Sequence, residues 1–241
     1  MNCPVQLGNF LYTKETKNTK IVSFVKNVSY VCSMEDQERE KQLLFATTEL
    51  FLKLGIKSLT MDDISRHLGI SKKTLYQYVS DKKDLVKKSI QLAIESDQCM
   101  LGDIAVQEEN AIDELLAINE KVSEKLQSIQ PAVMYDLQKH YPEAWTIMEN
   151  HKKCFVCDMI VRNINVGVSQ GLYRENVNPG IVARIYITMI DKIFDADTFP
   201  VHQYTFATIH KEIARYHIRG IASEKGVKYL VKRFKDNNHD F

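Results

Sequence analysis

The chain has 241 residues, of which 44% are hydrophobic and 26% are charged, a composition ordinary for a protein with one small and one larger core. Its formal net charge is only +1, which excludes an acidic or basic excess spread over the whole chain. No apolar run approaches the ~20 residues of a membrane helix, so we expect no membrane association.

Residues 1–33 differ in character from the rest of the chain. They contain Pro4, Gly8, a polar stretch with several lysines, and an alternating run over residues 21–31 that suits a weak strand. They lack the apolar segment and cleavage site of a secretory signal. The five cysteines of the chain are an odd number without the spacing of a disulfide framework, so we expect a cytoplasmic protein. We interpret them as a flexible tail or as an upstream extension before a true start at Met34; an arm that touches a DNA minor groove is the alternative.

Three predicted helices follow this segment. Residues 37–55 carry apolar stripes at helical spacing. After them, Ile64 and Leu68 share one helix face, and Leu75 and Val79 share another. Two short amphipathic helices therefore stand close together in the sequence.

The ends of these helices are marked by local signals. Thr60 and Ser71 are good N-caps for the two short helices, and Asp81 is a good N-cap for a longer helix after them. Gly69 lies between the short helices, where a sharp turn needs a positive φ. This layout is typical of a helix-turn-helix.

The second short helix presents a hydrogen-bonding face. With Leu75 and Val79 turned inward, Lys73 and Gln77 point most directly outward, and four more polar side chains flank them: Lys72, Thr74, Tyr76 and Tyr78. Residues 71–88 contain six lysines and two aspartates, a net charge of +4 in a nearly neutral chain. The spacing predicts a local cationic surface that enters a DNA major groove. Lys73 and Gln77 are expected to make the main contacts with the base edges there.

The same stretch resembles the DNA-binding motif of the tetracycline-repressor (TetR) family of bacterial regulators, T-x-x-x-I-A-x-x-x-G-V-S-x-x-T-L-Y-x-Y-F-x-x-K-x-x-L. The matching residues are Thr60, Ile64, Gly69, Ile70, Ser71, Thr74, Leu75, Tyr76, Tyr78, Lys82 and Leu85, whereas Ser65 replaces the usual Ala and Val79 the usual Phe. The resemblance implies a DNA-binding domain over residues 34–100. It also implies phosphate contacts by Thr60, Thr74, Tyr78 and Lys82.

Residues 101–241 carry signals of further helices and none of strands. Helical patterns are predicted for residues 107–130, 131–140, 142–168, 179–196 and 201–221, with a short last helix from residue 224. The prediction is an all-α protein of about ten helices, with a helical second domain that binds a ligand and mediates dimerisation, as the resemblance implies.

The two late helices are apolar over more of their surface than one core requires, which indicates an additional interface. In the resembling family these helices form a symmetric four-helix dimer contact. The side chains expected there are Ile185, Met189, Ile193, Ile209, Ile213 and Tyr216.

A ligand cavity is also implied by the resemblance, among the middle helices. Candidate lining residues are Met134, Tyr135, Trp145, Met148 and Phe155, for which an ordinary core is the competing interpretation. The sequence has no phosphate-binding glycine loop, nucleophile elbow or zinc-protease helix, so we expect no catalytic residues, metal or cofactor.

Together these patterns predict a homodimeric DNA-binding transcription regulator. The resemblance implies a repressor that a small molecule releases from a palindromic DNA operator. The alternative is a DNA-bound organising factor without an inducer, whose second domain binds a protein partner.

Overall fold

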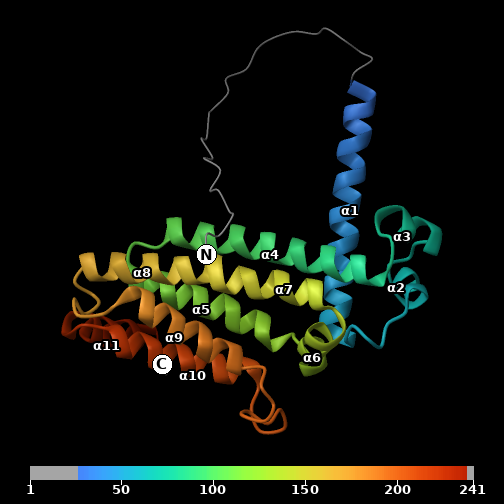
Figure 1. Ribbon diagram of the computed structural model, residues 1–241. Helices are drawn as coiled ribbons and strands as arrows, with labels where there is room; N and C mark the ends of the chain where they lie inside the picture. Colours follow the sequence, from blue (N-terminus) through green and yellow to red (C-terminus); the bar gives the residue numbers. More distant parts are fainter. Residues whose placement is uncertain (1–26, 238–241) are drawn as a thin grey trace. The chain divides into compact units, whose positions relative to one another are not determined.

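The computed structural model describes residues 27–237, with side chains over residues 36–234, and shows an all-helical protein (Figure 1). The α-helices are α1 (Asn27–Leu54), α2 (Met61–His67), α3 (Lys72–Tyr78), α4 (Lys82–Gln107), α5 (Ala111–Gln127), α6 (Pro131–His140), α7 (Pro142–His151), α8 (Cys157–Ser169), α9 (Pro179–Lys192), α10 (Phe206–Ile221) and α11 (Glu224–Asn237). A π-helical segment, η1 (Lys152–Val156), joins α7 to α8. Counted as one long helix, α7, η1 and α8 bring the described residues to ten helices, which confirms the predicted fold class.

The chain divides into two compact units, and the division lies within α1, after Leu43. In the first unit, α1 begins at Asn27, well before the predicted start at residue 37. The weak strand expected over residues 21–31 is therefore wrong for residues 27–31, which are helical; the rest of that prediction lies outside the described residues.

The second unit contains the remaining helices, several of which pack against one another. Here α5 packs against α10 and α8, α8 packs against α9, and α4 packs against α7 (Figure 1). Because α4 runs to Gln107, it continues past the predicted domain boundary at residue 100 and packs against α5 and α7, which belong to the second half of the chain (residues 101–241).

Three predicted helix starts after residue 100 are confirmed, because they depend on local chemistry. Pro131 and Pro142 occupy the first turns of α6 and α7, and Asn178 caps α9. Two starts differ from the prediction. α5 begins at Ala111 and not at residue 107, because α4 continues to Gln107 and Asn110 caps α5. α10 begins at Phe206 and not at residue 201, because Thr205 accepts a hydrogen bond from the Thr208 backbone N–H and caps the helix there.

The core of the second unit contains one close helix–ring approach and two buried histidines. A Cβ added to Gly167 would lie 2.1 Å from the ring of Tyr173, which is 1% exposed, so only glycine lets α8 approach this ring. Burial also lowers the pKa of His210 and His217 on α10, the α10 histidine pair, to about 4. Both histidines are therefore neutral in the folded protein near pH 7.

Among the described residues, no helix combines the length and apolar character that crossing a membrane requires. Within the same residues, no three His, Cys, Asp or Glu side chains are grouped so that they could hold a metal ion.

Candidate nucleic-acid interface

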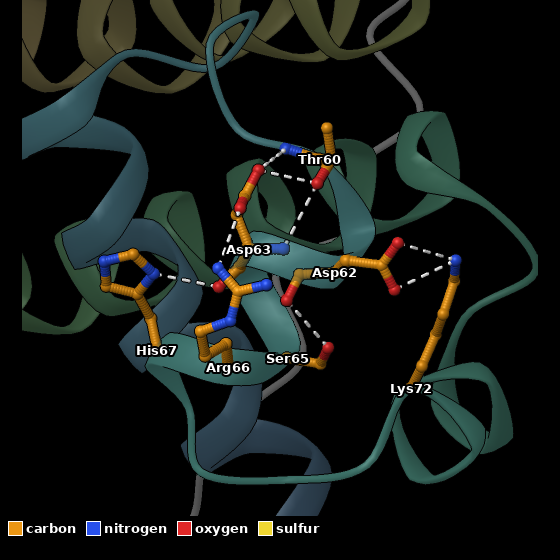
Figure 2. Close-up of polar contacts among 7 residues, drawn as sticks. All are labelled: Thr60, Asp62, Asp63, Ser65, Arg66, His67 and Lys72. Carbon is orange, nitrogen blue, oxygen red and sulfur yellow. Dashed lines mark hydrogen bonds and ion pairs between the residues drawn. The ribbon is translucent and has the colours of Figure 1, made fainter.

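The α2 helix is held at its start by a reciprocal pair of hydrogen bonds. The Asp63 backbone N–H donates to the Thr60 hydroxyl oxygen (3.2 Å), and the Thr60 backbone N–H donates to the Asp63 carboxylate (3.0 Å) (Figure 2). The Thr60 hydroxyl also donates to the same carboxylate (2.6 Å). These bonds lower the pKa of Asp63 below its usual value, so the cap is charged and complete at neutral pH.

The turn from α2 into α3 follows the predicted geometry. Gly69 has a φ of 66°, which residues with a side chain rarely adopt. Ser71 then caps α3 by accepting a hydrogen bond from the Thr74 backbone N–H (3.0 Å). Leu75 is fully buried and Val79 is 3% exposed, so the inward face of α3 is the predicted one.

The opposite face of α3 is open to solvent. Lys73 and Gln77 are exposed, as is Tyr76, while Thr74 and Tyr78 are half-buried beside them. The outward face thus carries an ammonium, an amide and a phenol. These groups supply the donors and acceptors that can distinguish base edges in a major groove.

An ion pair joins the two short helices. The Lys72 Nζ lies 3.0 Å from one Asp62 carboxylate oxygen and 3.1 Å from the other (Figure 2). This hydrogen bond raises the pKa of Lys72, and both side chains are on the surface. Sequence spacing did not predict the pair, because its partners come from different helices.

Two other lysines of this region point into the protein. The Lys82 Nζ donates to the backbone carbonyls of Ile56 (2.7 Å) and Leu59. The Lys88 Nζ donates to the Tyr78 carbonyl (2.6 Å) at the end of α3. Both ammonium groups therefore satisfy backbone acceptors at the ends of helices or turns.

The predicted cationic surface is consequently smaller than the sequence charge of +4 indicated. Lys87 pairs with Glu143 at the start of α7 (2.9 Å), and Lys72 pairs within the helix-turn-helix. Of the six lysines between residues 71 and 88, all of them in the described part of the chain, only Lys73 and Lys83 make no hydrogen bond or ion pair. These two are the free cations of the region.

The predicted cavity-lining residues divide by exposure. Met134 is buried, and Trp145, Met148 and Phe155 are half-buried. Tyr135 is 56% exposed, and its hydroxyl accepts a hydrogen bond from Lys139 (2.5 Å), so its assignment to an enclosed cavity is corrected: it lies on the outer face of α6. A cleft of about 290 Å³ lies between the start of α4 and the start of α7, and none of the predicted residues lines it.

The predicted dimer residues also divide. Ile193 is 1% exposed and Ile209 is 6% exposed, so these two pack inside their own protomer and their assignment to a surface is corrected. Ile185 is 53% exposed and Tyr216 is 76% exposed, whereas Met189 and Ile213 are half-buried. Ile181, 58% exposed, lies one helical turn before Ile185 and was missed.

A buried polar group inside the second half was also missed. The Tyr186 hydroxyl donates to the Asn119 side chain (3.3 Å), and the Ser123 hydroxyl lies 3.0 Å from Nδ1 of His210. The sequence did contain a signal for these buried polar groups, because Asn119 and Ser123 stand four residues apart on the apolar side of one amphipathic helix. Buried polar groups of this kind need partners, and here they supply them to one another.

Comparison with known proteins gives concordant matches. Residues 43–88 match the model of the bacterial regulatory proteins of the tetR family. An uncharacterised helix-turn-helix transcriptional regulator, YvaF of Bacillus subtilis (strain 168), is 25% identical over 190 residues, which cover 77% of this chain and 97% of that protein. A TetR-family regulator from Agrobacterium tumefaciens has the same fold, with a TM-score of 0.63, 15% identity, and coverage of 78% of this chain and 99% of its own. A transcriptional regulator from Saccharomonospora viridis, solved in complex with choline, has a TM-score of 0.63 and 15% identity, with coverage of 78% and 100%.

Proposed function

We propose, since the chain belongs to the TetR family of helix-turn-helix transcriptional regulators, that it is a homodimeric repressor which a small molecule releases from a palindromic operator. The family consists of DNA-binding regulators and not of enzymes. The observation that carries the proposal is the exposed face of α3, where Lys73 and Gln77 have no role in holding the fold.

In this proposal α3 lies in the major groove. Gln77 pairs with adenine and Lys73 with guanine, and Lys72 is beside them. Thr60, Thr74, Tyr76 and Tyr78 face the sugar-phosphate backbone at the edges of the groove. Supporting this placement, Thr60 and Ser71 fix the starts of α2 and α3, and the Lys72–Asp62 ion pair joins the two helices.

The test of base reading is a binding-site selection with the full chain and two variants. Gln77→Ala should relax preference at one or two positions of each half-site, because one good base contact is worth ~1–3 kcal/mol. Lys83→Ala is the matched control: it should weaken binding to every sequence equally and leave the selected motif unchanged. A motif identical for wild type and Gln77→Ala would remove Gln77 from base recognition.

The dimer is needed because one helix-turn-helix unit, here called a head, contacts too few bases for useful affinity. Its proposed surface comprises Ile181, Ile185 and Tyr216, with Met189 and Ile213 at its edge. Exposed apolar side chains gathered on two adjacent helices favour a second copy of the chain, because a symmetric contact buries each of them twice. The two α3 helices would then lie about 34–36 Å apart on one face of DNA.

Release by a small molecule is proposed from family membership, and the choline bound to the Saccharomonospora viridis protein is a property of that protein. In this chain the candidate lining residues are Met134, Trp145, Met148 and Phe155. Trp145 is the only tryptophan, so a compound that binds there should change its fluorescence. The same compound should dissociate the protein from DNA; choline and other small cations are a first set to titrate.

The alternative function, a DNA-bound interaction factor without an inducer, makes a different prediction. In that case the apolar surface on α9 and α10 would bind a different protein, so the purified chain would be monomeric. A dimer that loses DNA on addition of one compound supports the repressor. A monomer whose DNA binding no compound alters supports the alternative.

A further inference from the structure

The segment that leads into α2, residues 55–59, is held from one side by Lys82. This lysine is the first residue of α4, and its Nζ reaches across to the carbonyls of Ile56 (2.7 Å) and Leu59. Burial lowers the pKa of Lys82, while the nearby Asp136 and Asp63 carboxylates oppose that effect. The ammonium thus sits in a partly desolvated site among protein oxygens.

A second charged group holds the same segment from the other half of the fold. Asp136 of α6 is 6% exposed, and its carboxylate accepts a hydrogen bond from the Lys57 backbone N–H (2.8 Å). A buried carboxylate is costly unless a cation and donors compensate it. Lys82 is the nearby cation, and the two charged groups engage alternate polar groups of one short segment.

We infer that Lys82 is a positioning residue of the DNA-reading unit, and that Lys83, one residue later, makes the phosphate contact at the start of α4. The inference rests on the proposed function and departs from the family pattern, which implies a phosphate contact for Lys82. Turning the Lys82 ammonium toward DNA would take one donor from the Leu59 carbonyl and one from the Ile56 carbonyl, which would keep only its 3.4 Å bond from the Leu59 N–H. It would also remove a cation whose charge interacts with the buried Asp136 carboxylate. Lys83 is exposed and makes no hydrogen bond or ion pair in the described part of the chain, so it reaches a phosphate at no such cost.

This segment matters for DNA reading because it ends at Thr60, the cap of α2. If Lys82 and Asp136 release the segment, the start of α2 shifts, and α3 is packed on α2. Base recognition requires side chains held to within a fraction of an ångström, so a small shift reduces discrimination between sequences. Loss of a phosphate contact, by contrast, weakens binding to all sequences and reduces its salt dependence.

The experiment measures binding of the full chain to its selected operator and to unrelated duplex DNA over a series of salt concentrations. Lys83→Ala should reduce the slope of log affinity against log salt by about 0.9 for each head that contacts DNA. Lys82→Ala and Asp136→Asn should leave that slope at the wild-type value. Both should lower the ratio of operator to unrelated-DNA affinity by about tenfold, the effect of one lost base contact. The double variant should lose no more than either single variant, because both act on one segment.

Measurements are made at a low temperature at which circular dichroism shows each variant folded. Should Lys82→Ala not fold, Asp136→Asn carries the test, since its side chain lies on α6, away from the α3 face. A reduced salt slope for Lys82→Ala, or an unchanged discrimination ratio in both folded variants, would overturn the inference and leave the proposed function intact. A wild-type chain without salt-dependent DNA binding would refute the proposed function and this inference with it.

Discussion

The sharpest prediction concerns Tyr216, the most exposed side chain of the proposed dimer surface, at 76%. An aromatic side chain carries ~200 Å² of surface, so roughly 150 Å² of it would leave water in a dimer, worth at most about 4 kcal/mol at ~25 cal/mol per Å². Alanine would retain a small part of that burial, so Tyr216→Ala should cost about 2–3 kcal/mol in each protomer. Symmetry counts the change twice, and a loss of about 5 kcal/mol raises the dimer Kd by about 10³–10⁴-fold.

Sedimentation of the purified chain over a concentration series measures this Kd directly. Tyr135→Ala is the matched control, because Tyr135 is also exposed (56%) but lies on α6, outside the proposed surface. Ile209→Ala is the second control: its side chain is buried in its own protomer, so the variant should unfold more easily, by about 2–4 kcal/mol, without a comparable change in dimer Kd. If Tyr216→Ala, like Tyr135→Ala, dissociates at the same concentration as wild type, Tyr216 does not belong to the dimer surface.

Three further predictions test other contacts. Asp62→Asn should free the ammonium of Lys72 for a phosphate and steepen the salt dependence of DNA binding by about 0.9 per head; an unchanged slope would mean that the ion pair persists or is irrelevant on DNA. Gly167→Ala should lower the free energy of unfolding by about 3 kcal/mol or more, because its Cβ would lie 2.1 Å from a buried ring. Gly102→Ala, with open space around its Cβ, should raise the free energy of unfolding by about 0.5–1 kcal/mol. Equal effects of the two substitutions in urea unfolding would contradict this. Folding lowers the pKa of each histidine of the α10 histidine pair to about 4, from about 6.5 in the unfolded chain. The stability that depends on their neutral form is therefore complete above pH 6.5 and is lost as the pH falls toward 4, by up to about 3 kcal/mol for each histidine. A free energy of unfolding that stays constant between pH 6.5 and pH 4 would refute neutral burial.

The helix-turn-helix could be predicted in detail because its signals are local. Thr60, Ser71 and Asp81 cap the three helices at which the sequence placed them, and Gly69 has the positive φ that its position required. A cap or a turn involves residues within about one helical turn of one another, so its energetics are written in a short segment. Helix starts marked by Pro131, Pro142 and Asn178 were predictable for the same reason.

The candidate DNA-binding site was only half accessible in this way. Helical periodicity assigned Lys73 and Gln77 to the outward face of α3, since Leu75 and Val79 define the inward face. Periodicity could not assign Lys82 to backbone carbonyls more than 20 residues earlier in the chain. Counting lysines therefore overstated the cationic surface, because a charge in the sequence carries no record of its partner.

The sequence by itself determined the type of each helix, its caps, and the face that each short helix turns inward, all of which follow from interactions between near neighbours. Tertiary structure alone decided that Ile193 and Ile209 are buried within one protomer while Ile185 and Tyr216 remain exposed, although all four belong to the two late segments in which the sequence predicted one shared interface. It also decided which lysines face solvent. Burial and ion pairing depend on which distant segments meet, and the free energy of those contacts is a property of the assembled fold and not of any one helix.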